Sequence, residues 1–196
     1  MTRAFTRAPD ARRQALIDAT RAVLARAGAQ GVSVRTVCAE AGVSPGLLRH
    51  YFAGIDALVE ATYDQVADIV QASLETAMAA AGADPRARLA AYVTASFAPA
   101  IADGALLATW LGFWSLAKSS PEMAAIHARS YARYRAVIED LVHAAAPAAD
   151  ARLAAIGIGA VVDGLWLELS LDPTSFTPAE AGAIAERAMA AMLSPS

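Results

Sequence analysis

The segment SVRTVCAEAGVSPGLLRHYF, residues 33–52, predicts two short helices joined by a sharp turn, over residues 34–41 and 45–51. Ser33 is a favourable N-cap for the first helix, and Gly42 can adopt the positive φ that ends it. Ser44 and Pro45 then supply a cap and a first helical residue for the second helix. Two short helices joined by a three-residue turn containing glycine are typical of a helix-turn-helix, whose second helix enters the major groove of DNA. The segment therefore predicts sequence-specific binding to double-stranded DNA.

The distribution of charge supports this interpretation independently, although the net charge of the chain is −3. Residues 1–52 hold eight arginines and three acidic residues, a formal charge of +5. Residues 53–196 hold seven arginines, one lysine and sixteen acidic residues, a formal charge of −8. A basic segment attracts phosphate while an acidic remainder repels it, so the N-terminal quarter is the part expected to contact DNA.

Composition excludes several other classes of protein. The chain is 57% hydrophobic, which is too apolar for a disordered protein. Its longest apolar run, near residues 154–162, ends at Asp163, well short of the roughly 20 residues that a membrane span needs. The N-terminus lacks the apolar core of a signal peptide, so we expect a cytoplasmic protein with no membrane partner. The single Cys38 excludes an internal disulfide or a cysteine-built zinc site and is expected to be a small buried residue.

The fold class predicted for the whole chain is all-α. Capping residues followed by proline mark four helix starts: Ser44-Pro45, Asp84-Pro85, Ser120-Pro121 and Thr177-Pro178. The last of these continues to Glu180, which predicts a capping box with Thr177. The pattern predicts nine helices, near residues 10–27, 34–41, 45–51, 56–80, 85–98, 104–118, 121–145, 150–171 and 178–193.

The order of basic arm, helix, helix-turn-helix, long connecting helix and helical body resembles the TetR family of transcriptional regulators. LIDATRAVLARAG and GVSVRTVCAEAGVSPGLLRHYF carry this resemblance. HYF followed by DALVEAT, the WLGFW segment and VVDGLWL are similar to BetI and its relatives, the choline-responsive repressors of the betaine pathway. The resemblance implies a three-helix DNA-binding domain over residues 1–55 and a six-helix ligand-binding and dimerisation domain over residues 56–196.

The resemblance also implies that Arg35 reaches a base edge and that the helix over 45–51 lies in the groove. By their chemistry, Arg35 and Arg49 can each pair bidentately with guanine or bind phosphate. Hydroxyl groups, the imidazole of His50 and the amides at the start of the second helix can donate to phosphate oxygens, whereas Phe52 is expected to anchor the core. The candidate DNA-binding residues are Ser33, Arg35, Thr36, Ser44, Pro45, Gly46, Arg49, His50 and Tyr51.

Two positions depart from the family pattern. Position 49 is often tyrosine in the family, so Arg49 implies a different contact. Relatives often carry a phosphate-binding lysine at the start of the fourth helix, where this chain has Ile55, so one phosphate contact per subunit is expected to be missing. We hypothesise that the arginines of the basic arm compensate: Arg3, Arg7, Arg12 and Arg13.

Aromatic residues of the body can surround a quaternary ammonium ion, at roughly 0.5–2 kcal/mol per ring, or can simply fill the core. The resemblance implies the first use, with choline as a possible effector. Trp110 and Trp114, on one helix face, are the strongest candidates. Asp163 shares a stripe with Leu153, Ile156, Ala160 and Leu167, where a buried acid needs a hydrogen bond, an arginine or a cation. The candidate ligand-binding residues are Tyr92, Phe97, Trp110, Phe113, Trp114, Tyr131, Tyr134, Asp163 and Trp166.

The helix over 150–171 carries a second face of Gly157, Val161, Gly164 and Glu168. Glycine inside a helix costs roughly 1 kcal/mol against alanine, so close backbone approach is predicted there. The resemblance places this helix and the one over 178–193 in a homodimer interface.

The function predicted from the sequence is therefore a ligand-responsive regulator, a repressor that binds a palindromic operator as a dimer and is released by a small molecule. No catalytic or metal-binding constellation is recognised, so neither an enzyme nor a cofactor is expected. The alternative is a helical ligand-binding or interaction protein that has lost DNA recognition, for which Ile55 is the support.

Overall fold

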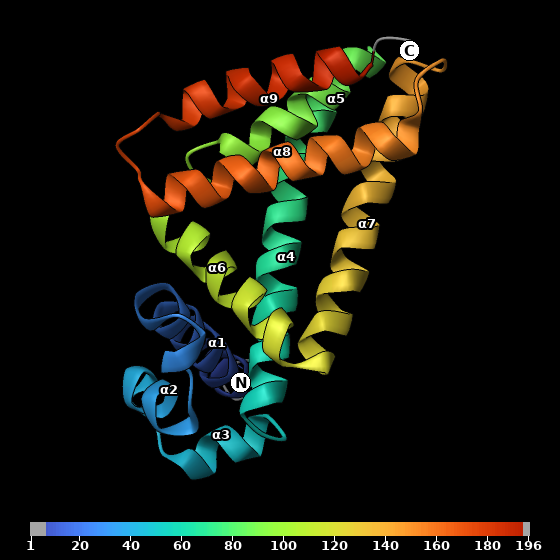
Figure 1. Cartoon of the computed structure of the whole chain (residues 1–196). Helices are drawn as coiled ribbons and strands as arrows, with labels where there is room; N and C mark the ends of the chain where they lie inside the picture. The colour runs from blue at the N-terminus through green and yellow to red at the C-terminus, as the bar shows by residue number, and fades with distance from the viewer. Residues whose placement is uncertain (1–6, 194–196) are drawn as a thin grey trace. The chain divides into compact units, whose positions relative to one another are not determined.

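The computed structural model describes residues 7–193, with side chains from residue 10 onward. Within that range the chain is all-α and has no strand, which confirms the predicted fold class (Figure 1). Nine α-helices and two short 3-10 segments follow one another: α1 (Arg7–Ala27), η1 (Ala29–Gly31), α2 (Val34–Ala41), α3 (Pro45–Tyr51), α4 (Ile55–Ala80), α5 (Pro85–Thr94), η2 (Ala95–Phe97), α6 (Gly104–Ser119), α7 (Pro121–Ala145), α8 (Ala151–Leu171) and α9 (Pro178–Met192).

The predicted capping residues begin their helices as expected. The hydroxyl of Thr177 accepts a hydrogen bond from the backbone N–H of Glu180, whose carboxylate accepts one from the backbone N–H of Thr177, so the capping box is confirmed. The hydrogen bonds that the carboxylate of Glu180 accepts from the backbone N–H and the hydroxyl of Thr177 lower its pKa. The carboxylate of Asp84 accepts from two amides at the start of α5, and the hydroxyl of Ser120 accepts from the amide of Met123 in α7. Each cap satisfies amides that have no partner within the helix.

Two predicted helix bounds were wrong, and proline explains both. The helix expected over 85–98 ends at Thr94 and continues as the 3-10 segment η2, after which Ala98 is extended with ψ near 150°. Pro99 follows Ala98, and a residue before proline is disfavoured in the helical region. Helix α1 begins at Arg7 rather than at residue 10, because Pro9 lies in a first turn whose amides need no intrahelical partner.

The residues separate into two compact units, which together include parts of every α-helix. Residues up to 66 together with 108–126 form the first unit, and residues 67–107 together with 127 onward form the second. Helices α4, α6 and α7 therefore each contribute to both units. The boundary predicted at residue 55 separates a DNA-binding domain from a ligand-binding domain, whereas the two units are defined by their internal packing. The predicted domain boundary therefore stays a prediction.

The core of the first unit joins α1, α2, α3 and the start of α4. Val37 and Cys38 of α2 and Leu48 of α3 pack against a row of apolar residues on α1. Phe52, directly after α3, is buried in the same cluster, which confirms that it is a core anchor. Cys38 is buried as expected, and burial raises the pKa of its thiol. Helix α3 is therefore held by the deeply buried Leu48 and by Phe52, which directly follows the helix.

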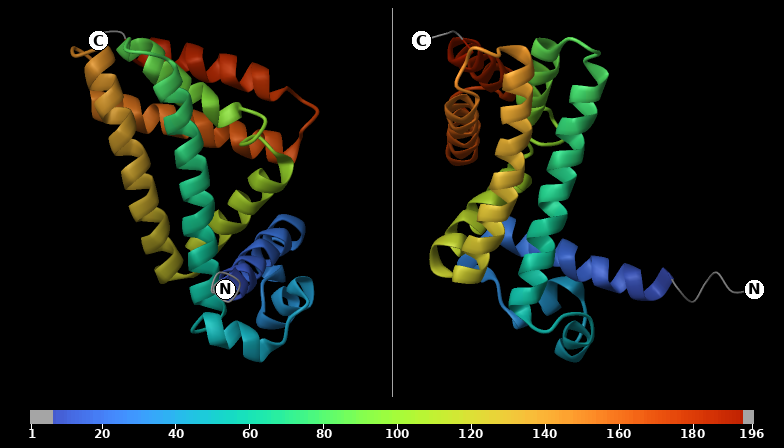
Figure 2. Two further views of the ribbon diagram at one scale, coloured as in Figure 1. Left: turned by 180° about the vertical axis from the view of Figure 1, so that it is seen from behind. Right: turned by 90° about the vertical axis from the view of Figure 1, so that its right-hand side faces the viewer.

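In the second unit α8 and α9 lie side by side, and α5 contacts α9 (Figure 2). A Cβ atom placed on Gly157 of α8 would lie 2.8 Å from the sulfur of Met192 in α9. Gly157 therefore permits a close approach between α8 and α9 of the same chain. Helix α8 is long and apolar enough to meet the length and composition criteria for a membrane span. One such helix is weak evidence, because a core helix passes the same test.

Candidate DNA interface and effector site

The helix-turn-helix forms as the sequence predicts. Ser33 and Thr36 form a capping box at the start of α2, with N···O distances of 3.1 and 3.0 Å between backbone amides and hydroxyls. Gly42 ends α2 in the left-handed region, with φ of 64°, where a side chain would be strained. The hydroxyl of Ser44 accepts from the amide of Leu47 at 3.3 Å, and Pro45 is the first residue of α3. Local chemistry alone therefore builds this motif.

Most of the predicted DNA-binding residues are exposed. Arg35 on α2 and Arg49 and His50 in the last turn of α3 are exposed, and the ring of His50 meets that of the half-buried Tyr51 edge to face at 4.9 Å. Ser44, Pro45 and Gly46 at the start of α3 are exposed too, whereas Ser33 and Thr36 are half-buried. The structure therefore brings the candidate set together on α2 and α3.

Thr36 has a structural role in addition to its candidate role in DNA contact. Its hydroxyl donates to the carbonyl oxygen of Gly31 at 2.7 Å, which ties the start of α2 to η1. Ile55, the first residue of α4, is half-buried and packs against the core cluster of the first unit. This packing explains why an apolar side chain occupies position 55.

The aromatic candidates divide between the two units. Trp110 and Phe113 of α6 are buried against Tyr63 of α4 in the first unit, with ring centroids 5.3 and 4.8 Å from that of Tyr63. Trp114 is half-buried in the same unit. A role for these three residues in effector binding stays a prediction. In the structure Trp110 and Phe113 are core residues. The other six candidates belong to the second unit.

In the second unit three tyrosines and one carboxylate lie together. The rings of Tyr92 on α5 and Tyr134 on α7 are stacked with centroids 6.0 Å apart, and Tyr131 meets Tyr134 edge to face at 6.2 Å. The hydroxyl of Tyr131 donates to Oδ1 of Asp163 on α8 at 2.9 Å. We call Tyr92, Tyr131, Tyr134 and Asp163 the tyrosine–aspartate cluster.

Further residues fix this cluster from neighbouring elements. The hydroxyl of Tyr92 donates to the side-chain oxygen of Gln71 on α4 at 2.9 Å. The indole N–H of Trp166 donates to the carbonyl oxygen of Ser96 at 3.0 Å, which joins α8 to η2. Phe97 is buried and faces Gly182 of α9. Trp166 and Phe97 therefore pack and orient the elements that carry the cluster.

Burial dominates the electrostatics of the cluster. It raises the pKa of Asp163 to about 6, and the hydrogen bond from Tyr131 and the charge of Arg135 only partly oppose this rise. Burial raises the pKa of Tyr92 to about 12. It also raises the pKa of Tyr134, an effect that the nearby Tyr92 and Asp163 strengthen and the side chain of Ser96 weakens. A carboxylate in such surroundings is stabilised by a cation.

Sequence reasoning missed three residues beside the cluster. Gln71 holds Tyr92, the ring of His127 lies 4.1 Å from that of Tyr131, and the guanidinium carbon of Arg135 lies 5.9 Å from the Tyr131 ring centroid. Burial and the charge of Arg135 lower the pKa of His127. These contacts join residues on different helices or on one helix face, and no local motif marks them.

The stripe on α8 has a different environment from the one expected. Leu153, Ile156 and Leu167 are exposed, with relative exposures of 58, 39 and 38%, whereas Asp163 turns inward to Tyr131. The partner expected for this acid is a hydrogen bond, which the hydroxyl of Tyr131 donates to Oδ1 of Asp163 at 2.9 Å. The prediction of a close-approach face was also incomplete, since Gly157 already contacts Met192.

Among residues 10–193, no group of three or more His, Cys, Asp and Glu side chains is arranged to hold a metal ion. What the geometry provides is an exposed, arginine-bearing helix-turn-helix in one unit and a half-buried carboxylate among tyrosines in the other. A chain of this construction is a DNA-binding protein of the helix-turn-helix class with a separate helical body.

Comparison with known proteins identifies the family. Residues 16–62 match the model of the tetR family of bacterial regulatory proteins, and residues 85–194 match the C-terminal domain of BetI-type transcriptional repressors. The HTH-type transcriptional regulator BetI of Paraburkholderia xenovorans is 36% identical over 166 residues, which cover 84% of this chain and 85% of that protein. The chain therefore belongs to the TetR family of transcriptional regulators and carries a BetI-type C-terminal domain.

Solved structures agree with this assignment. A transcriptional regulator from Pseudomonas aeruginosa is 41% identical and superposes with a TM-score of 0.87, covering 97% of this chain and 95% of that one. A regulator from Saccharomonospora viridis, solved in complex with choline, shares the fold with a TM-score of 0.79 at 16% identity, covering 91% of this chain and 95% of that one. The chain is thus a ligand-responsive DNA-binding regulator and not an enzyme.

Proposed function

We propose that the chain is a repressor that binds a two-fold symmetric operator as a homodimer and leaves it when a small organic cation, such as choline, binds the tyrosine–aspartate cluster. The observation that carries the proposal is the half-buried carboxylate of Asp163, which accepts a hydrogen bond from Tyr131 beside two further tyrosine rings. A regulator of this kind acts on the chromosome, so we place it in the cytoplasm.

Cation binding follows from the chemistry of the cluster. Burial disfavours the ionised form of its single carboxylate, and the positive charge of Arg135 opposes this effect only in part. A quaternary ammonium ion would balance that charge and lie against ring faces, each worth roughly 0.5–2 kcal/mol. The choline complex of the Saccharomonospora viridis regulator supports the same class of ligand on the same fold.

The exposed face of α8 supports dimerisation through α8 and α9, residues 150–171 and 178–193. Leu153, Ile156, Leu167 and Leu171 are exposed large apolar residues, and they recur at helical spacing along one side of α8 with Ala160 and Gly164. Large apolar patches exposed on a monomer mark interaction surfaces. Small residues within the stripe allow a partner helix to approach closely.

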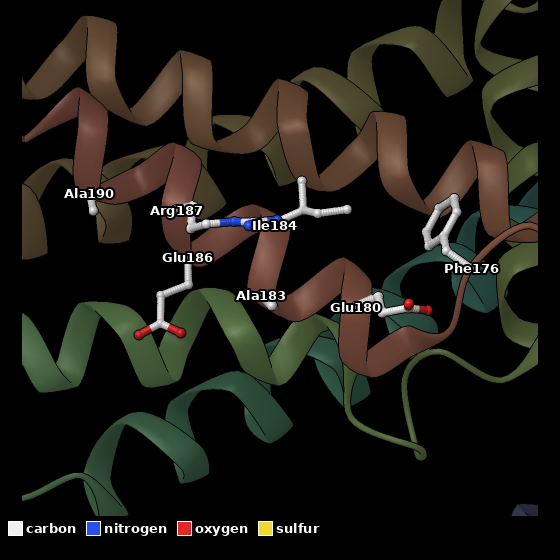
Figure 3. A pocket seen from close by; sticks show the side chains of 7 residues that line it. All are labelled: Phe176, Glu180, Ala183, Ile184, Glu186, Arg187 and Ala190. Carbon is white, nitrogen blue, oxygen red and sulfur yellow. The ribbon is translucent and has the colours of Figure 1, made fainter.

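Helix α9 continues this face. A shallow groove of about 590 Å³ runs along it, lined by the residues labelled in Figure 3: Phe176, Glu180, Ala183, Ile184, Glu186, Arg187 and Ala190. Ile184 is exposed, and Glu186 and Arg187 supply both signs of charge. A two-fold axis brings such a surface against a copy of itself, which allows acid and base to pair across it.

DNA recognition is proposed for α2 and α3, with the nine residues predicted above. Arg35 and Arg49 are exposed, and each is able to read guanine or to bind phosphate. Ile55 was the support for a protein that has lost DNA recognition. Its packing against the core explains that residue without loss of the interface, so the regulator is favoured. Helix α4, shared by both units, is the proposed link between effector and DNA.

Thermal unfolding tests the effector half of the proposal. Choline at about 100 times its dissociation constant should stabilise the protein by about 2.7 kcal/mol. The neutral carbon analogue of choline, in which a tert-butyl group replaces the trimethylammonium group, should not. Asp163→Asn should abolish the choline effect, whereas Asp140→Asn, on an exposed acid of α7, should retain it. Equal stabilisation by choline and its neutral analogue would contradict cation recognition.

A further inference from the structure

Arg13 of α1 differs in its contacts from two other arginines of the same helix. Arg26 is paired with Glu40 at 2.8 Å, and Arg21 lies 3.9 Å from Asp18. The guanidinium carbon of Arg13 instead lies 5.1 Å from the ring centroid of Phe52, and its side chain is exposed. Among the residues that the structure describes, none is recorded as a carboxylate partner of Arg13. Its charge is therefore available to an external anion.

Phe52 gives Arg13 a fixed position. This residue directly follows α3, its ring is buried in the core cluster, and its backbone N–H donates to the carbonyl oxygen of Leu48 at 2.9 Å. An exposed cation–π contact is worth roughly 0.5–1 kcal/mol, enough to favour one arrangement of a flexible side chain. A planar guanidinium stacked on a ring keeps its N–H donors at its edge, where they can bind an oxyanion.

The turn between α3 and α4 has no cation of its own. The segment from Phe52 to Glu60, FAGIDALVE, contains neither lysine nor arginine. Ile55 within it is packed on the core, and Asp56 is exposed. Arg13 is thus a basic side chain that the fold brings to the start of this turn, next to the end of α3.

We propose that Arg13 is a phosphate-binding residue of the DNA interface and that Phe52 positions it. The contact is with the DNA backbone, because Arg13 lies on α1 and not on the helix that enters the groove. It therefore contributes affinity on any duplex and adds no base preference. This inference rests on DNA binding through α2 and α3.

The test measures how DNA affinity depends on salt. Fluorescence anisotropy would follow the full chain and its Arg13→Gln and Arg26→Gln variants on the DNA upstream of its own gene and on an unrelated duplex. Losing one phosphate contact lowers the salt slope by about 0.9 for each subunit bound. For two subunits, the ratio of affinities at about 50 and 200 mM salt should then fall about 10-fold for Arg13→Gln, equally on both duplexes.

Arg26→Gln is the matched control, because Arg26 is also exposed on α1 but is paired with Glu40 at 2.8 Å. It should change the slope by less than half as much. An unchanged slope for Arg13→Gln, an equal change for both variants, or a loss confined to the upstream DNA would each overturn the proposal. If the parent protein itself shows no salt-dependent binding, DNA recognition fails; if it binds and Arg13→Gln matches it, only this inference fails.

Phe52→Leu tests positioning, because leucine keeps an apolar anchor and removes the ring. Its salt slope should fall as for Arg13→Gln, and the double variant should lose nothing more. Circular dichroism and thermal melting would establish that Phe52→Leu is folded. Should it unfold, Arg13→Lys decides, since lysine keeps the charge without the planar stack. Recovery of less than half of the lost affinity by lysine is expected, and full recovery would contradict a role for Phe52.

Discussion

The sharpest consequence of the tyrosine–aspartate cluster is that cation binding should depend on pH. The pKa of Asp163 is raised to about 6 in the ligand-free protein. A cation binds the ionised carboxylate, so its apparent dissociation constant rises as the carboxyl takes up a proton. Affinity should be close to its limit near pH 7.5 and about 10-fold weaker near pH 5, with about half a proton released per cation bound near pH 6.

The raised pKa of Asp163 also predicts how the stability of the ligand-free protein depends on pH. The folded pKa of Asp163 is higher than its ordinary value, so the folded state binds more protons and loses stability as pH rises from about 4 to about 6. The loss persists at higher pH and amounts to at most about 3 kcal/mol. Asp163→Asn should therefore make the ligand-free protein more stable at neutral pH, by about 1–3 kcal/mol, while removing its response to choline.

Isothermal titration calorimetry with choline between about pH 5 and 7.5, in buffers of different ionisation enthalpy, measures both affinity and proton release. His127 contacts Tyr131, and burial and the charge of Arg135 lower its pKa, so its own titration must be separated from that of Asp163. His127→Gln is the control and should retain the pH dependence. A dissociation constant that stays flat across the range, or a pH dependence that vanishes in His127→Gln, would refute the assignment to Asp163.

Three further predictions concern other parts of the fold. Thr177→Ala removes the hydroxyl that accepts from the amide of Glu180 and donates to its carboxylate, and it should lower the free energy of unfolding by about 1 kcal/mol in urea denaturation; no change would show that this hydroxyl is not needed. Leu171→Glu, at a residue 67% exposed on α8, should shift the protein to monomer in analytical ultracentrifugation without lowering its monomer stability. An unchanged dimer would move the interface elsewhere. Arg49→Gln should weaken operator binding in gel shifts, by about 1–3 kcal/mol and with relaxed sequence preference if the contact is to guanine; an equal loss on unrelated DNA would identify a phosphate contact.

Features set by neighbouring residues were predictable from the sequence. The capping hydroxyls of Ser33 and Ser44 and the positive φ of Gly42 act within a few residues, so the motif follows from local chemistry. The end of the helical segment near residue 98 also has a local cause, because Pro99 disfavours a helical conformation at Ala98. Burial of Phe52 followed from its place directly after α3.

Features set by packing between distant helices were not predictable in this way. The bond between Tyr131 and Asp163 joins residues 32 positions apart, and the contact of Gly157 with Met192 joins α8 to α9. The pattern of α8 offers more than one apolar face, and its packing against α9 decides which face stays exposed. The position of Arg13 over Phe52 likewise depends on how α1 packs, since the two residues are far apart in the sequence.

The central claim is that a cation at Asp163 controls affinity for DNA. The direct measurement is fluorescence anisotropy on the DNA upstream of the chain's own gene, with and without saturating choline, for the parent protein and for Asp163→Asn. Choline should weaken DNA binding by the parent 5- to 150-fold, the range of typical allosteric coupling of about 1–3 kcal/mol, and should leave Asp163→Asn bound with the affinity of the ligand-free parent. Equal release of both proteins by choline, or release of neither, would contradict the account.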